Sequence, residues 1–312
     1  MDAGPSREGQ PYAGAVMNFL RRAASIPGVR VVLLQPDVRR AVASVLALRF
    51  LVAAWVTTKP FAVLAGEALS RGEVRTYLIR ATGVRVAMQH GRDLEALFEL
   101  FVRGEYEPPP GEVGDRLTTE SVKAVLDVGA NVGMFSAWAR GRWPDASIVT
   151  VEPAPENLVV LHEQAVHDRR TVVIEAAVAP RDGEIAFVEG WGSGSHAPTT
   201  GEAATTVVRT VDWFPLFAAA DLVKMDIEGG EWPVLADPRL RELKRLTLVM
   251  EYHRVGAPSL PAGAAARRLL EEAGFEVGHD HPQQLGTRNT LGLEGLTDPR
   301  GHPPRGSRAN TS

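Results

Sequence analysis

Two apolar segments of this chain are each followed by side chains that can exchange protons. Asp226 and Glu228 follow the run LVKM, and Glu251 and His253 lie in MEYH at the end of a second run. Because alternate residues of a strand point the same way, Glu251 and His253 share one face. An imidazole with a pKa of about 6.5 accepts protons at neutral pH. The four residues predict a site that deprotonates an acceptor hydroxyl, with His253 as the base and Asp226 holding the acceptor or a cofactor amine.

The same residues have simpler explanations, which the sequence leaves open. Asp226 and Glu228 can cap a helix that starts near Gly230, where the helix dipole favours acids, and Glu231 suits the first turn of that helix. His253 can be a solvated loop histidine. Two carboxylates also suit magnesium, but a pair of acids is weak support for a metal site, so we do not expect one.

A glycine-rich turn lies in VLDVGANVG, residues 125–133, where an apolar strand gives way to a helix. In such sheets ligands bind beyond the carboxyl ends of the strands. Gly129 lets the chain turn tightly, and Gly133 lets the helix begin close to a ligand. Asp127 can accept a hydrogen bond from a cationic amine, and Asn131 can bind through its amide or its backbone. The predicted cofactor-binding residues of this turn are Asp127, Gly129, Ala130, Asn131 and Gly133.

Three further positions suit a nucleoside beside this turn. Glu152 ends the second strand and can accept both hydroxyls of a ribose. Ala176 and Ala177 follow the third strand, where small side chains leave room for an adenine ring. Together with Asp127, these residues predict a nucleoside that carries an amino-acid tail. A dinucleotide is disfavoured, because GANVG lacks the GxGxxG spacing and because Asp127 would repel a pyrophosphate.

The surrounding pattern predicts an α/β domain. Short apolar runs alternate with helical stripes, which indicates a mostly parallel sheet with helices on both faces. The predicted strands are 124–128, 147–151, 171–175, 222–225, 246–252 and the pair 275–277 with 290–293. The predicted helices of this domain are 132–140, 155–166 and 262–273.

Composition divides the chain into four parts. Residues 1–14 are rich in Gly, Pro and polar groups and are expected to be disordered. Residues 15–107 are expected to form a helical region, which the run PPPG then ends. The α/β domain is assigned to residues 112–296. The tail 297–312, rich in Gly, Pro, Arg and Ser, is expected to be mobile.

One apolar segment, residues 41–58, is about long enough to span a bilayer. Arg49 lies in its middle, and a charge at the centre of a membrane helix costs roughly 2.5–3.5 kcal/mol. The stripe that this helix would present consists of Val45, Leu48, Val52 and Trp55. We expect a buried or interfacial helix in preference to a membrane-associated one, and therefore no pelleting with lipid vesicles.

The bulk composition excludes several classes of function. The 312-residue chain has a formal net charge of -4, so its surface offers no general attraction for the phosphate backbone of a nucleic acid. It contains no cysteine, which excludes disulfides, thiolate metal sites and cysteine nucleophiles. The lack of cysteine agrees with a reducing compartment, and we expect a cytoplasmic protein.

Three segments carry a family resemblance. VLDVGANVGMFS, VEPAPENL and DLVKMDIEGGEWPVL resemble the FkbM family of S-adenosylmethionine (SAM)-dependent methyltransferases, over residues 80–278, and KMDIEGGE at 224–231 is the most specific piece. The resemblance implies SAM as the cofactor, a Rossmann-like class I fold with a seven-stranded sheet and a last antiparallel strand, and methyl transfer, usually to oxygen. The acceptors it implies are polyketides, sugars and other small secondary metabolites or glycans. N-methylation and a non-catalytic SAM-binding or membrane-associated role stay open, as does the oligomeric state.

Overall fold

A computed structural model describes residues 48–107, 117–188, 204–259, 261–282 and 289–296 of the chain. The chain forms two compact units. The N-terminal unit comprises Met1–Tyr106, Val132–Gly141 and Val159–His167, and the sheet unit comprises Glu107–Asn131, Arg142–Leu158 and Asp168–Ser312. The two terminal segments for which disorder or mobility is expected, 1–14 and 297–312, lie outside the described residues.

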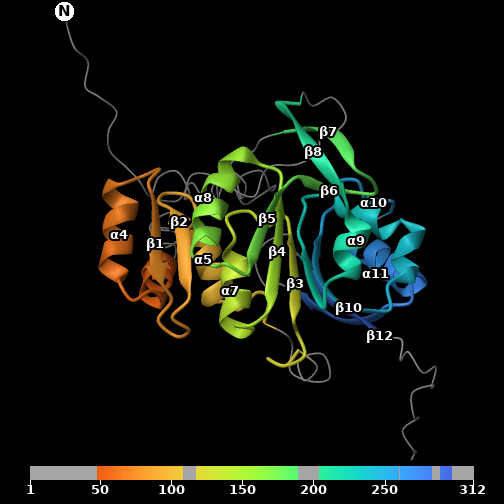
Figure 1. Ribbon diagram of the computed structural model, residues 1–312, viewed down its shortest axis with the longest axis horizontal. Helices are drawn as coiled ribbons and strands as arrows, with labels where there is room; N and C mark the ends of the chain where they lie inside the picture. Colours follow the sequence, from red (N-terminus) through yellow and green to blue (C-terminus); the bar gives the residue numbers. More distant parts are fainter. Residues whose placement is uncertain (1–47, 108–116, 189–203, 260, 283–288, 297–312) are drawn as a thin grey trace, which may run out of the picture. The chain divides into compact units, whose positions relative to one another are not determined.

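The main sheet of the sheet unit consists of β3 (Ala124–Val128), β4 (Ser147–Glu152), β5 (Thr171–Glu175), β9 (Leu222–Met225), β10 (Arg245–Tyr252), β11 (Glu276–Pro282) and β12 (Asn289–Leu296). Their order is β11-β12-β10-β9-β3-β4-β5 (Figure 1). Neighbouring strands from β10 to β5 are parallel, whereas β12 runs antiparallel to both β10 and β11. This order agrees with the predicted mostly parallel sheet and its antiparallel last strand.

Apolar side chains hold the central strands in place. All four residues of β9 and four of the five residues of β3 are buried. Such continuous apolar runs are typical of parallel strands that are covered on both faces. Because β3 lies between β4 and β9, the strand order reverses at β3. Ligands of doubly wound sheets bind at the carboxyl ends of the strands at this point.

Three α-helices follow the later strands of the sheet unit: α9 (Trp213–Ala218), α10 (Glu231–Leu235) and α11 (Ala262–Glu272). Both α9 and α11 contact β10, and α10 contacts α11. The helices α7 (Met134–Arg142) and α8 (Pro155–Val166) fall mainly in the N-terminal unit. The expectation that helices cover both faces of the main sheet therefore stays a prediction.

A second, three-stranded sheet was not predicted from the sequence. Its strands β6 (Ala177–Ala179), β7 (Gly183–Phe187) and β8 (Thr206–Asp212) pair in the order β6-β8-β7. Arg239 fixes the end of β8, because its guanidinium donates to Asp212 at 2.8 Å and to Asp237 at 2.7 Å. The short 3₁₀ helix η1 (Pro238–Glu242) carries this arginine.

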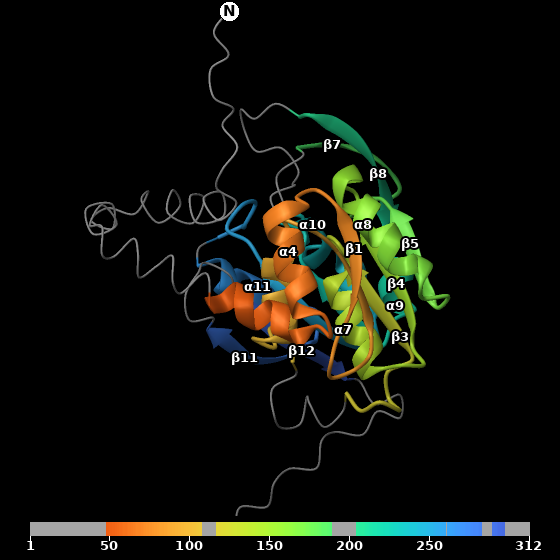
Figure 2. The same cartoon turned by 90° about the vertical axis from the view of Figure 1, so that its left-hand side faces the viewer.

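The N-terminal unit is not purely helical, which corrects the expectation for residues 15–107. Its described part contains helical residues 48–56, α4 (Pro60–Leu69) and α5 (Leu94–Phe101). Between α4 and α5 lies an antiparallel hairpin of β1 (Val74–Leu78) and β2 (Arg85–Gln89) (Figure 2). Each strand is only five residues long and neither alternates strictly between apolar and polar residues, so they do not stand out from a helical pattern.

The apolar stripe predicted within residues 41–58 is not buried. Leu48, Val52 and Trp55 are exposed, and Ala53 and Ala54 form the buried side of the helix instead. Val45, the fourth member of the stripe, lies outside the described residues. Within the described part of the chain, no helix is both long enough and apolar enough to cross a membrane.

Candidate active site

The glycine turn after β3 has the backbone geometry that its sequence predicts. Gly129 and Gly133 have φ values of 70° and 81°, and Asn131 between them has a φ of 51°. A side chain at Gly129 cannot be accommodated, because an added Cβ would lie 1.8 Å from the backbone oxygen of Asp226. An added Cβ at Gly133 would lie 2.7 Å from the Cδ1 atom of Leu161. The two glycines are therefore required by close packing as well as by their left-handed backbone.

Glu152 is tied to this turn by hydrogen bonds. Its Oε2 atom accepts from the backbone N of Asn131 at 2.8 Å. Its Oε1 atom accepts from the backbone N of Ala154 at 2.9 Å and from Nδ2 of Asn157 at 3.1 Å. Burial raises the pKa of Glu152 to about 7, although these hydrogen bonds and the charge of Lys224 oppose the shift. The predicted ribose acceptor thus already organises the turn.

The side-chain oxygen of Asn131 differs from the carboxylate of Glu152 in its hydrogen bonding. Oδ1 of Asn131 is buried and has no hydrogen-bond partner in the described part of the chain. The backbone groups of the preceding residues are occupied, since Gly129 N and Ala130 N both donate to the carbonyl of Val151, at 3.0 and 3.1 Å. Among the described residues, an acceptor is thereby left without a donor at the turn.

Ala176 and Ala177 lie at the same edge of the sheet as Glu152. The register pairs Glu152 directly with Glu175, so Ala176 follows at the carboxyl end of β5. Ala176 is buried, and Ala177 begins β6. The two small side chains therefore lie at the strand end beside which an adenine ring is expected to bind.

Asp127 has a charged neighbour that the sequence did not predict. The carboxylate is fully buried, and Nζ of Lys224 lies 3.5 Å from its Oδ1 atom. The same Nζ donates to the carbonyl of Gly129 at 2.7 Å. Burial would lower the pKa of Lys224, but the charges of Asp127 and of nearby acids outweigh it and raise the pKa. Asp127 is therefore an ion-pair partner of the protein's own lysine, and its contact with a cofactor amine stays a prediction.

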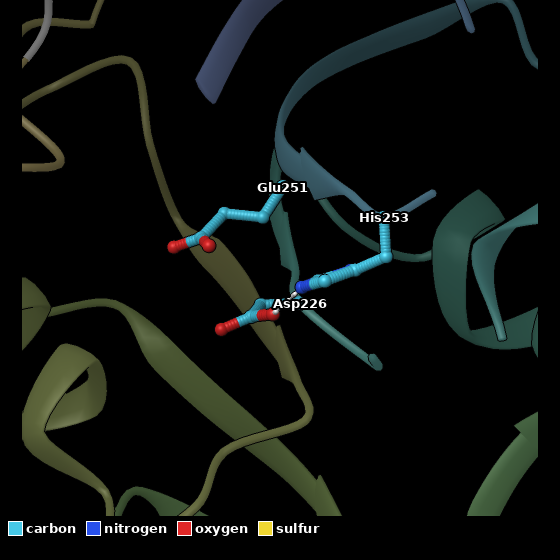
Figure 3. Close-up of side chains that lie close together, drawn as sticks. All are labelled: Asp226, Glu251 and His253. Atoms are coloured by element: carbon cyan, nitrogen blue, oxygen red, sulfur yellow. Dashed lines mark ion pairs between the residues drawn. The ribbon is translucent and has the colours of Figure 1, made fainter. Parts of the chain in front are cut away.

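Three of the four predicted acid–base residues converge beyond β9 and β10. Asp226 directly follows β9, Glu251 is the second-last residue of β10, and His253 directly follows β10. One side-chain ligand atom of each lies within 4.8 Å of the others (Figure 3). Figure 3 shows the side chains of Glu251 and His253 pointing toward Asp226, as strand alternation predicts.

The fourth residue, Glu228, contacts the histidine. Oε2 of Glu228 lies 3.2 Å from Nε2 of His253, and Oδ1 of Asp226 lies 3.8 Å from the same nitrogen. Glu228 has a φ of 49°, which only a few per cent of residues with a side chain adopt. Gly229, with a φ of 101°, continues this loop. The loop conformation thus brings a carboxylate to the imidazole.

Glu231 contacts the other side of the ring. Oε1 of Glu231 lies 3.3 Å from Nδ1 of His253 and accepts from the backbone N of His253 at 2.5 Å. Its Oε2 atom accepts from Gly229 N at 2.8 Å. The sequence predicted for Glu231 only a place in the first turn of a helix, and this prediction was incomplete. Glu231 begins α10, but it also fixes the orientation of the histidine.

These neighbours change the charge of His253. Burial lowers its pKa, but the hydrogen bond to Glu231 and the charges of Glu228, Glu231 and Asp226 together raise the pKa to about 9. The imidazole is therefore mostly protonated at neutral pH. The expectation of an unperturbed histidine with a pKa of about 6.5 is wrong for this environment.

From the sequence, Asp226 and Glu228 were the two acids considered as metal ligands. In the structure, the group with the spacing of metal ligands is instead formed by Asp226, Glu251 and His253. Two carboxylates and an imidazole are a usual donor set for a divalent ion. The charge of Lys224, however, already acts on both Asp226 and Glu251. This neighbouring cation makes the cluster less favourable for a second cation.

The strand order, the reversal at β3, the glycine turn and the acid at the end of β4 together define a class I methyltransferase fold. Residues 127–277 match the methyltransferase FkbM domain. The chain therefore carries an FkbM domain and is a SAM-dependent methyltransferase, with SAM as its methyl donor. Methyltransferase sdnD of Sordaria araneosa is 25% identical over 205 residues, which cover 51% of this chain and 76% of that protein.

Similar solved structures include two methyltransferase-fold proteins. Precorrin-6y C5,15-methyltransferase from Geobacter metallireducens is 15% identical, with a TM-score of 0.34 and coverage of 59% of this chain and 86% of that chain. Fibrillarin from Aeropyrum pernix, solved with natively bound SAM, is 14% identical, with a TM-score of 0.33 and coverage of 55% and 66%.

Proposed function

We propose that the chain transfers the methyl group of SAM to a hydroxyl oxygen of a small molecule, such as a secondary metabolite, a polyketide or a sugar. The observation that carries this proposal is the group of Asp226, Glu228, Glu251 and His253 beside the glycine turn. The two parts are in contact, because the backbone oxygen of Asp226 occupies the place that a side chain at Gly129 would need. An acid–base group thus adjoins the cofactor turn.

The residues of the turn are suited to SAM. The left-handed backbone of Gly129, Asn131 and Gly133 turns the chain tightly at the carboxyl end of β3, where such sheets bind their ligands. The buried Oδ1 of Asn131 offers an acceptor for a cationic amine, and Glu152 retains acceptor capacity for ribose hydroxyls, because a carboxylate has about four acceptor positions. When bound, SAM supplies an activated methyl group on a sulfonium. The protein then has mainly to position the acceptor.

The acceptor side supplies a base. In its neutral form, His253 takes the proton of the acceptor hydroxyl, while Glu228 and Glu231 stabilise the imidazolium that forms. Oδ1 of Asp226 makes no hydrogen bond in the described part of the chain and is available to orient the hydroxyl. With a pKa of about 9, the imidazole of His253 is neutral in roughly one molecule in a hundred at pH 7. The neutral form is therefore a strong base, but only a small fraction of the molecules carry it.

The decisive experiment measures methyl transfer to a panel of hydroxyl compounds and their amine analogues. We expect methylated products whose new group is attached to oxygen, as identified by mass spectrometry and NMR. Methylation of the amines alone would favour the N-methyltransferase alternative. SAM binding without turnover on any acceptor would instead favour a non-catalytic role.

A further inference from the structure

The two helices at the start of the described chain expose apolar side chains along one face each. In residues 48–56, Leu48, Leu51 and Trp55 are exposed at helical spacing. In α4, Phe61 is 74% exposed and Leu69 85% exposed. The rings of Trp55 and Phe61 pack edge to face with their centroids 6.0 Å apart, which joins the two faces. We call these five residues the apolar docking face.

The charged residues of these helices point the other way. Helical residues 48–56 contain one charged side chain, Arg49, which pairs with Glu95 and lies over the ring of Phe98 at 4.6 Å. The α4 helix also contains one, Glu67. Its carboxylate contacts Nδ1 of His90 at 2.8 Å and accepts from the backbone N of a glycine at 3.0 Å.

This arrangement is the reverse of an ordinary surface helix, which turns its polar side outward. Single exposed apolar residues are common and need no explanation. A continuous apolar face, in which both available charges are directed inward, marks a surface that contacts an apolar phase. Trp55 suits the boundary between lipid tails and headgroups, where amphipathic tryptophan rings are enriched, and Phe61 beside it suits the apolar face of an interfacial helix.

The distribution of charge identifies the partner. Residues 1–60 contain eight Lys or Arg and three Asp or Glu, whereas the whole chain contains 34 Lys or Arg and 38 Asp or Glu. Lys59 is exposed between the two helices, next to the aromatic pair. An anionic bilayer attracts such a basic segment. A second copy of the chain would bring two basic segments together, which like-charge repulsion opposes.

We propose that the apolar docking face lies on the surface of an anionic lipid bilayer, with Trp55 and Phe61 in the headgroup region and the exposed Lys59 beside the lipid phosphates. This reverses the expectation that Arg49 keeps the segment away from lipid. Arg49 does not meet the lipid in this arrangement, because Glu95 and Phe98 hold it on the inner side. A helix that lies along the surface also needs no membrane-spanning length.

The test is co-sedimentation of the full chain with vesicles of phosphatidylcholine, with and without phosphatidylglycerol. We expect pelleting with the anionic vesicles, weakened by high salt, and much less with the neutral ones. Trp55→Ser combined with Phe61→Ser should lower the partition coefficient at least about tenfold, the scale of removing one large buried apolar side chain. Because both positions are exposed, the variant should keep its circular dichroism spectrum and melting temperature.

The matched control replaces two exposed valines of α8, Val159→Ser with Val166→Ser, and should pellet like the unchanged protein. Lys59→Glu separates charge from apolar contact and should weaken binding to the anionic vesicles only. The proposal is overturned if the unchanged protein stays in the supernatant, or if the α8 control loses binding as strongly as the aromatic variant. A dimer that the aromatic variant converts to a monomer, without vesicle binding, would show that a second copy covers this face.

Discussion

The cofactor side and the acceptor side of the site differ in how far the protein satisfies its own polar groups. At the cofactor side, Glu152 receives three hydrogen bonds and Lys224 holds the carbonyl of Gly129. At the acceptor side, three carboxylates act on a single imidazole, and Oδ1 of Asp226 makes no hydrogen bond in the described part of the chain. The first side is preformed by backbone geometry, whereas the second keeps an excess of acceptors for a ligand that brings donors.

The largest effect should come from Gly129→Val, which disrupts the glycine turn on the cofactor side. The new Cβ would collide with the backbone of Asp226, so we expect SAM binding to be lost in isothermal titration calorimetry, with NAD failing to bind either protein. Gly83→Ala is a matched control, because Gly83 also has a positive φ but has open space around its Cβ position. If Gly129→Val bound SAM normally while folded, the turn would not be the cofactor site.

His253→Ala tests the acceptor side. Turnover should fall roughly a hundredfold or more, the usual contribution of a general base, while SAM affinity stays nearly unchanged. His167→Ala, at a largely solvent-accessible histidine of the N-terminal unit, serves as the control. Unchanged turnover in His253→Ala would remove the histidine from the mechanism, and an acceptor that is already acidic would then explain the rate. Asp226→Ala should harm both turnover and binding, because Asp226 adjoins both sides.

The pH dependence sharpens the contrast between the two sides. Because the base form of His253 is the neutral one and its pKa is about 9, kcat/KM should rise with pH, reach half of its maximum near pH 9 and level off above that pH. Glu228→Gln removes a charge that raises this pKa, so the rising limb should move to lower pH. A limb that does not move, or a rate that falls between pH 7 and pH 9, would show that the protonated imidazole is the active form.

The smallest expected effect is that of Glu152→Ala, because the turn keeps its other contacts. SAM binding should weaken by about 1–3 kcal/mol, the range for a lost hydrogen bond to a charged group. Since the charged carboxylate is the better acceptor and its pKa is about 7, SAM affinity of the unchanged protein should rise as the pH passes through 7. In Glu152→Gln this pH dependence should disappear, and its persistence would assign the titration to another group.

Local patterns predicted much of the fold. The strand Ala124–Val128 and the helix Pro155–Val166 have the predicted bounds, because a continuous apolar run and a proline at the helix start are encoded within the segment. The three-stranded sheet was missed because its strands are short and pair across chain segments far apart in sequence. The exposure of Trp55 was also missed. It depends on which side of the helix packs against the rest of the unit, and Ala53 and Ala54 are the residues buried there.

The same distinction applies to the site. Positions at strand ends were sufficient to predict that Asp226, Glu251 and His253 come together. The charge of His253 was not predictable, because it depends on the left-handed backbone of Glu228 and on hydrogen bonding of His253 to the carboxylate of Glu231. For Lys224 a signal was present, since a lysine inside an apolar strand must find a buried partner.

The contact between Gly129 and Asp226 constrains how this domain can be recombined with its relatives. The two residues follow different strands, β3 and β9, yet the backbone of Asp226 fills the space that a side chain at Gly129 would need. A chimera with a crossover between Gly129 and Asp226 would join halves whose backbones were not matched to each other. Exchanging residues 127–231 as one block should keep this fit, and Glu251 and His253, which follow the block, can then be exchanged separately.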